Sequence, residues 1–69
     1  MIKDLHANMK DYRLYSKRVK GLKGIQSYLI YKVSNDGVNE NEEFIADIKK
    51  LKDAHDIILM LIKRDKGVK

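Results

Sequence analysis

The side chains best suited to catalysis are those of two histidines, His6 and His55. His55 stands near Asp53 and Asp56, but a metal site needs ligands that converge, and adjacent residues such as His55 and Asp56 diverge on a helix. Three serines lack the nearby base or glycine-rich elbow that a nucleophile requires: Ser16, Ser27 and Ser34. We therefore predict that the chain is not an enzyme, with no catalytic residue and no metal ligand.

Two further stretches have the composition of ligand-binding loops without the necessary spacing. Gly21 and Gly24 are too close together for a phosphate-binding loop, and no predicted strand precedes them. Asn35-Asp36-Gly37 lacks the alternating ligands of a calcium loop. The sequence therefore predicts no cofactor and no small-molecule substrate.

The most informative chemical feature is a group of basic residues in the first half of the chain. Residues 1–33 carry eight Lys or Arg and two acidic residues, hence a net charge of +6. On a helical wheel five of these basic residues share one side: Lys3, Lys10, Arg13, Lys17 and Lys20. Cationic groups bind carboxylates and displace the counterions of phosphates, so this basic face predicts an acidic protein partner or nucleic acid, DNA or RNA. Many charged faces serve only solubility, which is the third interpretation.

The basic residues would lie on a first helix over residues 2–33, because apolar residues recur there at spacings of mostly three and four. The apolar positions are Ile2, Leu5, Met9, Tyr12, Tyr15, Val19, Leu22, Leu29, Ile30 and Val33. Gly21 and Gly24 predict a kink or break, since glycine disfavours a helix interior. Residues 25–33 also favour a strand, but no partner strand is evident, so a helix is preferred.

A turn and a second helix follow in the prediction. Gly37 can end a helix, although Asn-Asp-Gly is also typical of a hairpin turn. Asn39 and Glu42 have the spacing of a capping box, which predicts a second helix over residues 40–65. Six residues at spacings of four and three form a heptad-like seam on it: Phe44, Ile48, Leu51, His55, Ile58 and Ile62.

The last turns of this second helix are apolar on every side, from Ile57 to Ile62. One partner helix cannot cover such a segment, which predicts a homodimer in which two antiparallel hairpins form a four-helix bundle. The oligomer interface would contain Ile57, Met60, Leu61 and Ile62. His55 would be the polar residue of the seam, where a histidine can set register or respond to pH.

The chain of 69 residues is long enough for one small helical domain, residues 1–69, with a basic tail at 66–69 that frays. Cysteine is absent, which is compatible with a reducing cytoplasm. The sequence contains no run of about 18 apolar residues, so no membrane-spanning helix is predicted. The first residues lack the apolar core of a signal peptide. A cytoplasmic location is therefore predicted. The composition, rich in Lys, Ile, Asn, Asp and Tyr, indicates an AT-rich genome such as that of a Gram-positive bacterium, a plasmid or a phage.

The predicted outline resembles that of plasmid-encoded Rop-type RNA-binding proteins in three features: a helix, a turn near Asp36 and Gly37, and a second helix with a seam histidine at His55. No stretch matches closely enough to transfer functional residues. The Ser-x-x-x-Asp signature of the sporulation aspartyl-phosphate phosphatases is absent from residues 44–65. The sequence therefore predicts an all-α antiparallel two-helix hairpin: a non-enzymatic regulatory or adaptor protein acting through protein–protein contacts, or alternatively a nucleic-acid-binding protein.

Overall fold

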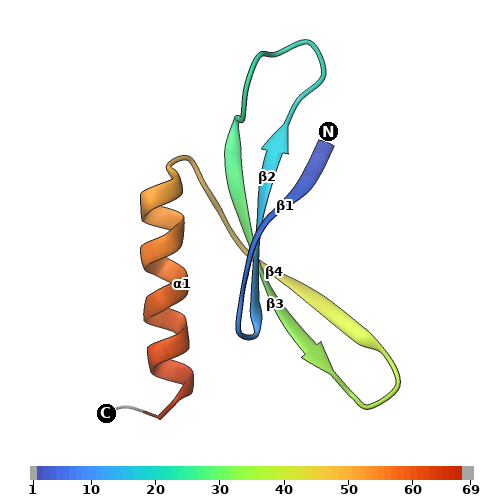
Figure 1. Ribbon diagram of the computed structural model, residues 1–69, viewed down its shortest axis with the longest axis vertical. Helices are drawn as coiled ribbons and strands as arrows, with labels where there is room; N and C mark the ends of the chain where they lie inside the picture. Colours follow the sequence, from blue (N-terminus) through green and yellow to red (C-terminus); the bar gives the residue numbers. More distant parts are fainter. Residues whose placement is uncertain (1, 68–69) are drawn as a thin grey trace.

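The computed structural model describes residues 2–67, which form one antiparallel sheet and one helix (Figure 1). The elements are β1 (Ile2–Met9), β2 (Tyr12–Arg18), β3 (Ser27–Asn35), β4 (Glu40–Ile48) and α1 (Leu51–Asp65). The strands are hydrogen-bonded in the order β1-β2-β3-β4, so each strand pairs with its neighbour in sequence. Sheet and helix form two layers, with α1 on one side of the sheet (Figure 1).

The predicted all-α hairpin is therefore wrong, and the error lies mainly in the period assigned to the first half. In β2 the buried residues are Tyr12, Leu14 and Ser16, separated by residues that are only partly buried. This alternation has a period of two, as a strand requires. The apolar positions that fit a 3.6-residue period in residues 2–33 fall on both faces of the sheet, apart from Val19 and Leu22, which lie in the β2–β3 loop.

The strand propensity of residues 25–33 is real, because β3 pairs with β2 on one side and β4 on the other. The partner that the sequence did not reveal is β4, whose acidic start has the pattern of a capped helix. The capping box at Asn39 and Glu42 is thus wrong. Asn-Asp-Gly instead forms the β3–β4 turn, in which the Asp36 carboxylate accepts hydrogen bonds from the N–H groups of Val38 (2.9 Å) and Asn39 (2.7 Å).

The break predicted near Gly21 and Gly24 exists, but it joins two strands rather than two helices. Both residues lie in the β2–β3 loop with positive φ, 91° and 74°. Residues with a side chain rarely adopt this conformation, whereas glycine does so readily. These two positions therefore let the chain reverse between β2 and β3.

Only the second half of the predicted helix over residues 40–65 is helical. In α1 the buried residues are Ala54, Ile58 and Leu61, which recur at spacings of four and three. They pack against Leu14 and Ile30, which are both fully buried in the two central strands. The apolar face of α1 is covered by the chain's own sheet, so the predicted four-helix bundle is also wrong.

One extra residue in each edge strand, His6 in β1 and Ile45 in β4, interrupts the register of the described pairs. A bulge of this kind reverses the alternation of side chains beyond it. Because of the bulge at Ile45, Glu42 and Phe44 face away from α1. In a regular strand they would point to the same side as Ala46, toward the helix.

We call the sheet face opposite α1 the open face. Directly opposed residues of neighbouring strands share a face, so the register defines its members. They are Lys3, Leu5, Asn8, Arg13, Tyr15, Lys17, Ser27, Leu29, Tyr31, Val33, Asn35, Glu40, Glu42, Phe44 and Asp47. Leu29 is only 4% exposed although it lies outside the core that contacts α1, so neighbouring side chains of the open face cover it.

The C-terminal end of the described chain is a hydrogen-bonded turn. The N–H of Lys66 donates to the carbonyl of Ile62 at 3.1 Å, and that of Gly67 donates to the carbonyl of Arg64 at 3.1 Å. Residues 68 and 69 of the predicted frayed tail lie outside the described residues. Within the described residues, no helix has the length and apolar character needed to cross a membrane.

The buried contact between α1 and the sheet predicts a specific stability loss. Replacing Ile58→Val removes one buried methyl group and should lower the free energy of unfolding by about 0.5–1.5 kcal/mol, and Ile58→Ala by about 2–5 kcal/mol. Met60→Ala, at an exposed position of the same helix, is the control and should change stability by less than about 0.5 kcal/mol. Urea unfolding followed by circular dichroism measures both. Equal effects at the two positions would contradict this packing.

Candidate functional site

The structure brings together three of the five residues of the predicted basic face. Lys3 of β1 and both Arg13 and Lys17 of β2 lie on the open face. Lys10 lies in the β1–β2 turn and Lys20 in the β2–β3 loop, so these two do not join the group. Strand alternation, rather than a helical face, therefore gathers the basic residues.

Three aromatic rings lie beside these cations. Tyr31 makes edge-to-face contacts with Tyr15 at a centroid distance of 5.3 Å and with Phe44 at 5.6 Å. The Lys3 ammonium nitrogen lies 4.4 Å from the ring centroids of both Tyr15 and Tyr31, within cation–π range. Phe44 remains 54% exposed, so one ring of the row is available to a ligand.

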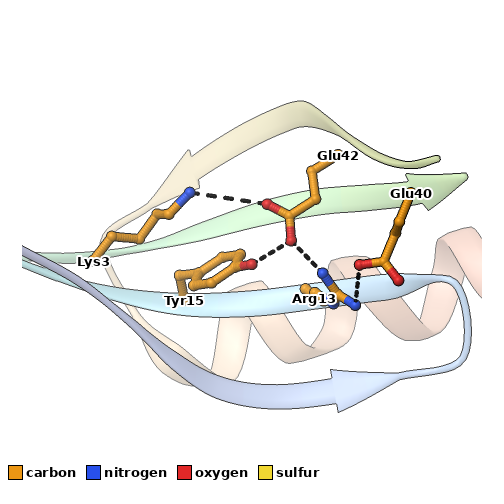
Figure 2. Close-up of polar contacts among 5 residues, drawn as sticks. All are labelled: Lys3, Arg13, Tyr15, Glu40 and Glu42. Atoms are coloured by element: carbon orange, nitrogen blue, oxygen red, sulfur yellow. Dashed lines mark hydrogen bonds and ion pairs between the residues drawn. The ribbon is translucent and has the colours of Figure 1, made fainter.

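The Glu42 carboxylate is the centre of the polar contacts on the open face (Figure 2). It accepts a hydrogen bond from the Tyr15 hydroxyl and another from the Arg13 guanidinium, with Nη1 and Oε2 2.5 Å apart. Its other oxygen lies 3.9 Å from the Lys3 ammonium nitrogen. One carboxylate from β4 thus receives donors from β1 and β2, across the width of the sheet.

The remaining charges of the face are also paired across strands. Arg13 divides its guanidinium between two carboxylates, since Nη2 lies 2.6 Å from an oxygen of Glu40. Lys17 lies 3.4 Å from a carboxylate oxygen of Asp47. The three cations of β1 and β2 therefore face three carboxylates of β4, and the open face is close to neutral overall.

The contacts change the proton affinities of the groups involved. Hydrogen bonds from Tyr15 and then Arg13 lower the pKa of Glu42 below its ordinary value of 4.5. Burial, followed by the hydrogen bond to Glu42, raises the pKa of Tyr15. The hydrogen bonds to Glu42 and Glu40 raise the pKa of Arg13. All three groups therefore keep their ordinary charge at neutral pH.

This arrangement favours the binding of anions over proton transfer. A carboxylate with a lowered pKa is a weak base at neutral pH, and a tyrosine with a raised pKa is a weak acid. Lys3, Arg13 and Tyr15 nevertheless converge on one point with an ammonium, a guanidinium and a hydroxyl group. Such donors suit a carboxylate or a phosphate oxygen, and Glu42 is the anion that they hold in this structure.

The sequence analysis missed several members of this site. The sequence places Glu40 and Glu42 at the start of a helix and Phe44 on its apolar seam, and it places Tyr31 on a helix, toward the side of the basic residues. One signal was present: strands read with a period of two would have aligned Arg13, Tyr15 and Lys17, but the bulge that turns Glu42 and Phe44 toward them has no recognisable sequence pattern.

The residues of the predicted oligomer interface divide between two environments on α1. Leu61 is buried against the sheet, and Ile57 and Ile62 are partly buried beside the same core. Met60 is 60% exposed. The structure therefore assigns part of this set to the core and leaves Met60 on the surface.

His55, the predicted seam residue, is exposed on α1. The predicted seam is wrong, because two of its residues, Phe44 and Ile48, lie in β4 rather than in a helix. Among residues 2–67, no three histidine or acidic side chains gather closely enough to hold a metal ion.

Comparisons with known proteins found no matching family model, no similar curated protein and no similar solved structure.

The Glu42 contacts predict a pH-dependent contribution to stability. Because the pKa of Glu42 is lowered in the folded state, its stabilisation is fully present above the unfolded value near 4.5 and is lost as the pH falls through the folded pKa. Replacing Glu42→Gln should lower the melting temperature at neutral pH, and this difference should shrink as the pH falls below 4.5. Thermal unfolding of both chains between neutral and acidic pH measures the effect.

The matched control is Glu43→Gln, which removes an exposed carboxylate of the same strand. The melting temperature of this variant should depend on pH in the same way as that of the unsubstituted chain. If the difference caused by Glu42→Gln did not change with pH, the carboxylate would not be stabilised by its donors.

Proposed function

We propose that this chain is a non-enzymatic binding protein that holds single-stranded nucleic acid on the open face of the sheet. The observation that carries the proposal is the gathering of Lys3, Arg13 and Lys17 beside the ring row of Tyr15 and Tyr31. Proteins bind single strands through this combination, because cations contact the backbone and aromatic faces stack on unpaired bases.

A phosphodiester would bind where the Glu42 carboxylate now lies. Lys3, Arg13 and Tyr15 already present their donors to an anionic oxygen at that point, and a phosphate oxygen accepts the same hydrogen bonds. Glu42 belongs to β4, an edge strand, so its side chain can turn toward solvent without disturbing a second neighbouring strand. In this proposal Glu42 competes with the phosphate for the site.

The aromatic row supplies the surface for bases. Phe44 is half-exposed, and it contacts Tyr31, which in turn contacts Tyr15. Stacking of a base on an aromatic side chain contributes about 1–3 kcal/mol and tolerates any sequence. Duplexes keep their bases stacked inside, so this surface favours single strands.

The net charge of the whole chain, +5, supports the same partner. The open face is nearly neutral, but the excess of cations elsewhere attracts a polyanion from a distance and raises the association rate. The open face therefore supplies the direct contacts with the bound strand, and the total charge supplies the long-range attraction that speeds association.

The competition between Glu42 and phosphate predicts a gain of affinity on mutation. Glu42→Gln keeps the size of the side chain and removes its negative charge, so the chain should bind a labelled single-stranded oligonucleotide of about ten nucleotides several-fold more tightly. Glu43→Gln makes the same change in net charge beside the site and should raise affinity much less. Fluorescence anisotropy measures both, with RNA and DNA versions compared. Equal gains in affinity from the two variants would show that net charge alone is responsible, and would contradict the proposal that phosphate binds in place of Glu42.

The cations of the open face predict the dependence of binding on salt. If Lys3, Arg13 and Lys17 each contact a phosphate, log Kd should change with log salt concentration with a slope of about 2 in magnitude. Arg13→Ala should reduce that slope by about 0.7, whereas Lys52→Ala, at an exposed position of α1, should leave it unchanged. Phe44→Ala should weaken binding about ten-fold with the slope preserved. Absent or salt-insensitive binding would remove the proposed function.

A further inference from the structure

A second surface of the molecule has the features of a binding groove. An open, shallow groove of about 570 Å³ lies along α1 and is lined by Leu59, Met60, Ile62, Lys63 and Lys66. All five residues belong to the last two turns of the helix or to the residue that follows it. Since α1 covers the opposite side of the sheet, the groove is separate from the open face (Figure 1).

The floor of the groove is apolar and exposed. Leu59 is 49% exposed and Met60 is 60% exposed, whereas Ile58 and Leu61, which flank them in the sequence, are buried against the sheet. Leaving apolar surface in water costs about 25 cal/mol per Å², and neighbouring exposed apolar side chains are typical of interaction sites. The unbranched side chain of Met60 can also adapt its shape to a partner.

The rim of the groove is cationic. Among the ion pairs between residues 2–67, neither Lys63 nor Lys66 takes part. The nearest carboxylate in the sequence, Asp65, is already engaged, because it accepts a hydrogen bond from the Tyr12 hydroxyl and lies 3.8 Å from the Lys32 ammonium nitrogen. The groove therefore presents positive charge that the described residues leave uncompensated.

A third lysine increases this excess of charge. Lys10, in the β1–β2 turn, borders a smaller hollow that shares Ile62 and Lys66 with the groove. The close contact with Lys10 and the repulsion between the two ammonium groups lower the pKa of Lys66. A bound carboxylate placed between Lys10 and Lys66 would relieve that repulsion.

We propose that this groove binds an acidic amphipathic helix of a protein partner. Its apolar side chains would pack on Leu59, Met60 and Ile62, and its carboxylates would pair with Lys63 and Lys66. Charge complementarity selects the partner, since an apolar helix with a basic border would meet like charges along the rim. The proposal is independent of nucleic-acid binding, because it uses a different layer of the molecule.

The shape of the groove favours a helix over an extended segment. Its lining residues recur at spacings of three and four along α1, so they form the ridges and grooves into which another helix packs. The lining extends over about two turns, or roughly 10 Å, which suits a helix that crosses α1. An extended segment would instead add to a sheet edge, where backbone groups are available.

The test uses a synthetic acidic peptide that forms an amphipathic helix, with leucines along one side and glutamates along both borders. Its control has the same composition in scrambled order. We expect saturable binding of the first peptide to the full chain by isothermal titration calorimetry, and much weaker binding of the second. Equal binding of the two peptides would overturn the proposal, because it would show attraction by charge alone.

Two variants locate the binding site. The double variant Lys63→Glu with Lys66→Glu should weaken binding about ten-fold or more, whereas Lys52→Glu at the other end of α1, which reverses one charge away from the groove, should have little effect. Met60→Lys should weaken binding through the apolar floor while adding positive charge. Circular dichroism confirms that each variant is folded. Unchanged binding by folded Met60→Lys would overturn the proposal.

A second copy of this chain is the competing occupant, and solution mass decides between the two. We expect sedimentation to give a monomer at the concentrations used for peptide binding. A dimer that dissociates in the Met60→Lys variant would assign the groove to self-association and overturn the partner proposal. Oligonucleotide binding by Met60→Lys should be retained and should rise no more than for Glu43→Gln, which makes the same change in net charge, so failure of this inference is distinguishable from failure of the proposed function.

Discussion

The packing of Ile58 in α1 against Leu14 and Ile30 in the sheet is the contact on which the rest of the structure depends. A chain of 69 residues has enough apolar side chains for one buried layer between a helix and a sheet. One helix can cover one face of a four-stranded sheet, so the other face must be closed by its own side chains or remain available to a ligand. Both surfaces proposed for binding follow from this limit.

The open face is closed mainly by polar groups. Glu42 reaches from the edge strand β4 toward Lys3, Arg13 and Tyr15, so one carboxylate joins side chains of three strands. Ion pairs near the surface contribute little stability individually, but here they share one carboxylate and are adjacent to aromatic rings. A site that is held together by an internal anion is also suited to exchanging that anion for an external one, which is the physical basis of the proposed function.

Helix α1 has the opposite character. Its inner side is apolar and buried, and its outer side still carries Leu59 and Met60. In the sequence, residues 57–62 are apolar all round, which predicts that one partner element cannot cover them. The sheet covers one side, and the exposed remainder forms the groove. The prediction of an interface here remains a prediction, now restricted to the outer side.

The sequence predicted the part of residues 40–65 that is helical, but not the sheet, and only three of the five basic residues that it grouped lie together. Tyr12 and Tyr15 fit a helical spacing in the sequence, yet the first faces α1 and the second lies on the open face. The strand propensity of residues 25–33 was visible, but its partner β4 begins with acidic residues that also suit a helix N-terminus. These segments are strands rather than helices because they pair with neighbouring strands, and such pairing depends on residues distant in the sequence.

The candidate site was even harder to predict, because its central residue depends on a bulge. Without the extra residue at Ile45, Glu42 would lie on the side of α1 and could not meet Arg13. Bulges depend on the fit between strands rather than on a local motif. The sequence thus contained the cations of the site but not the anion that they hold.

The most direct test of the account is a titration of the isotope-labelled chain with a short single-stranded oligonucleotide, followed by the amide chemical shifts. The largest changes should occur at Lys3, Arg13 and Tyr31, together with the side-chain N–H signals of Arg13 as it exchanges Glu42 for phosphate. The amides around Met60 should remain unchanged. Shifts confined to α1, or no saturable change on the open face, would contradict the central claim.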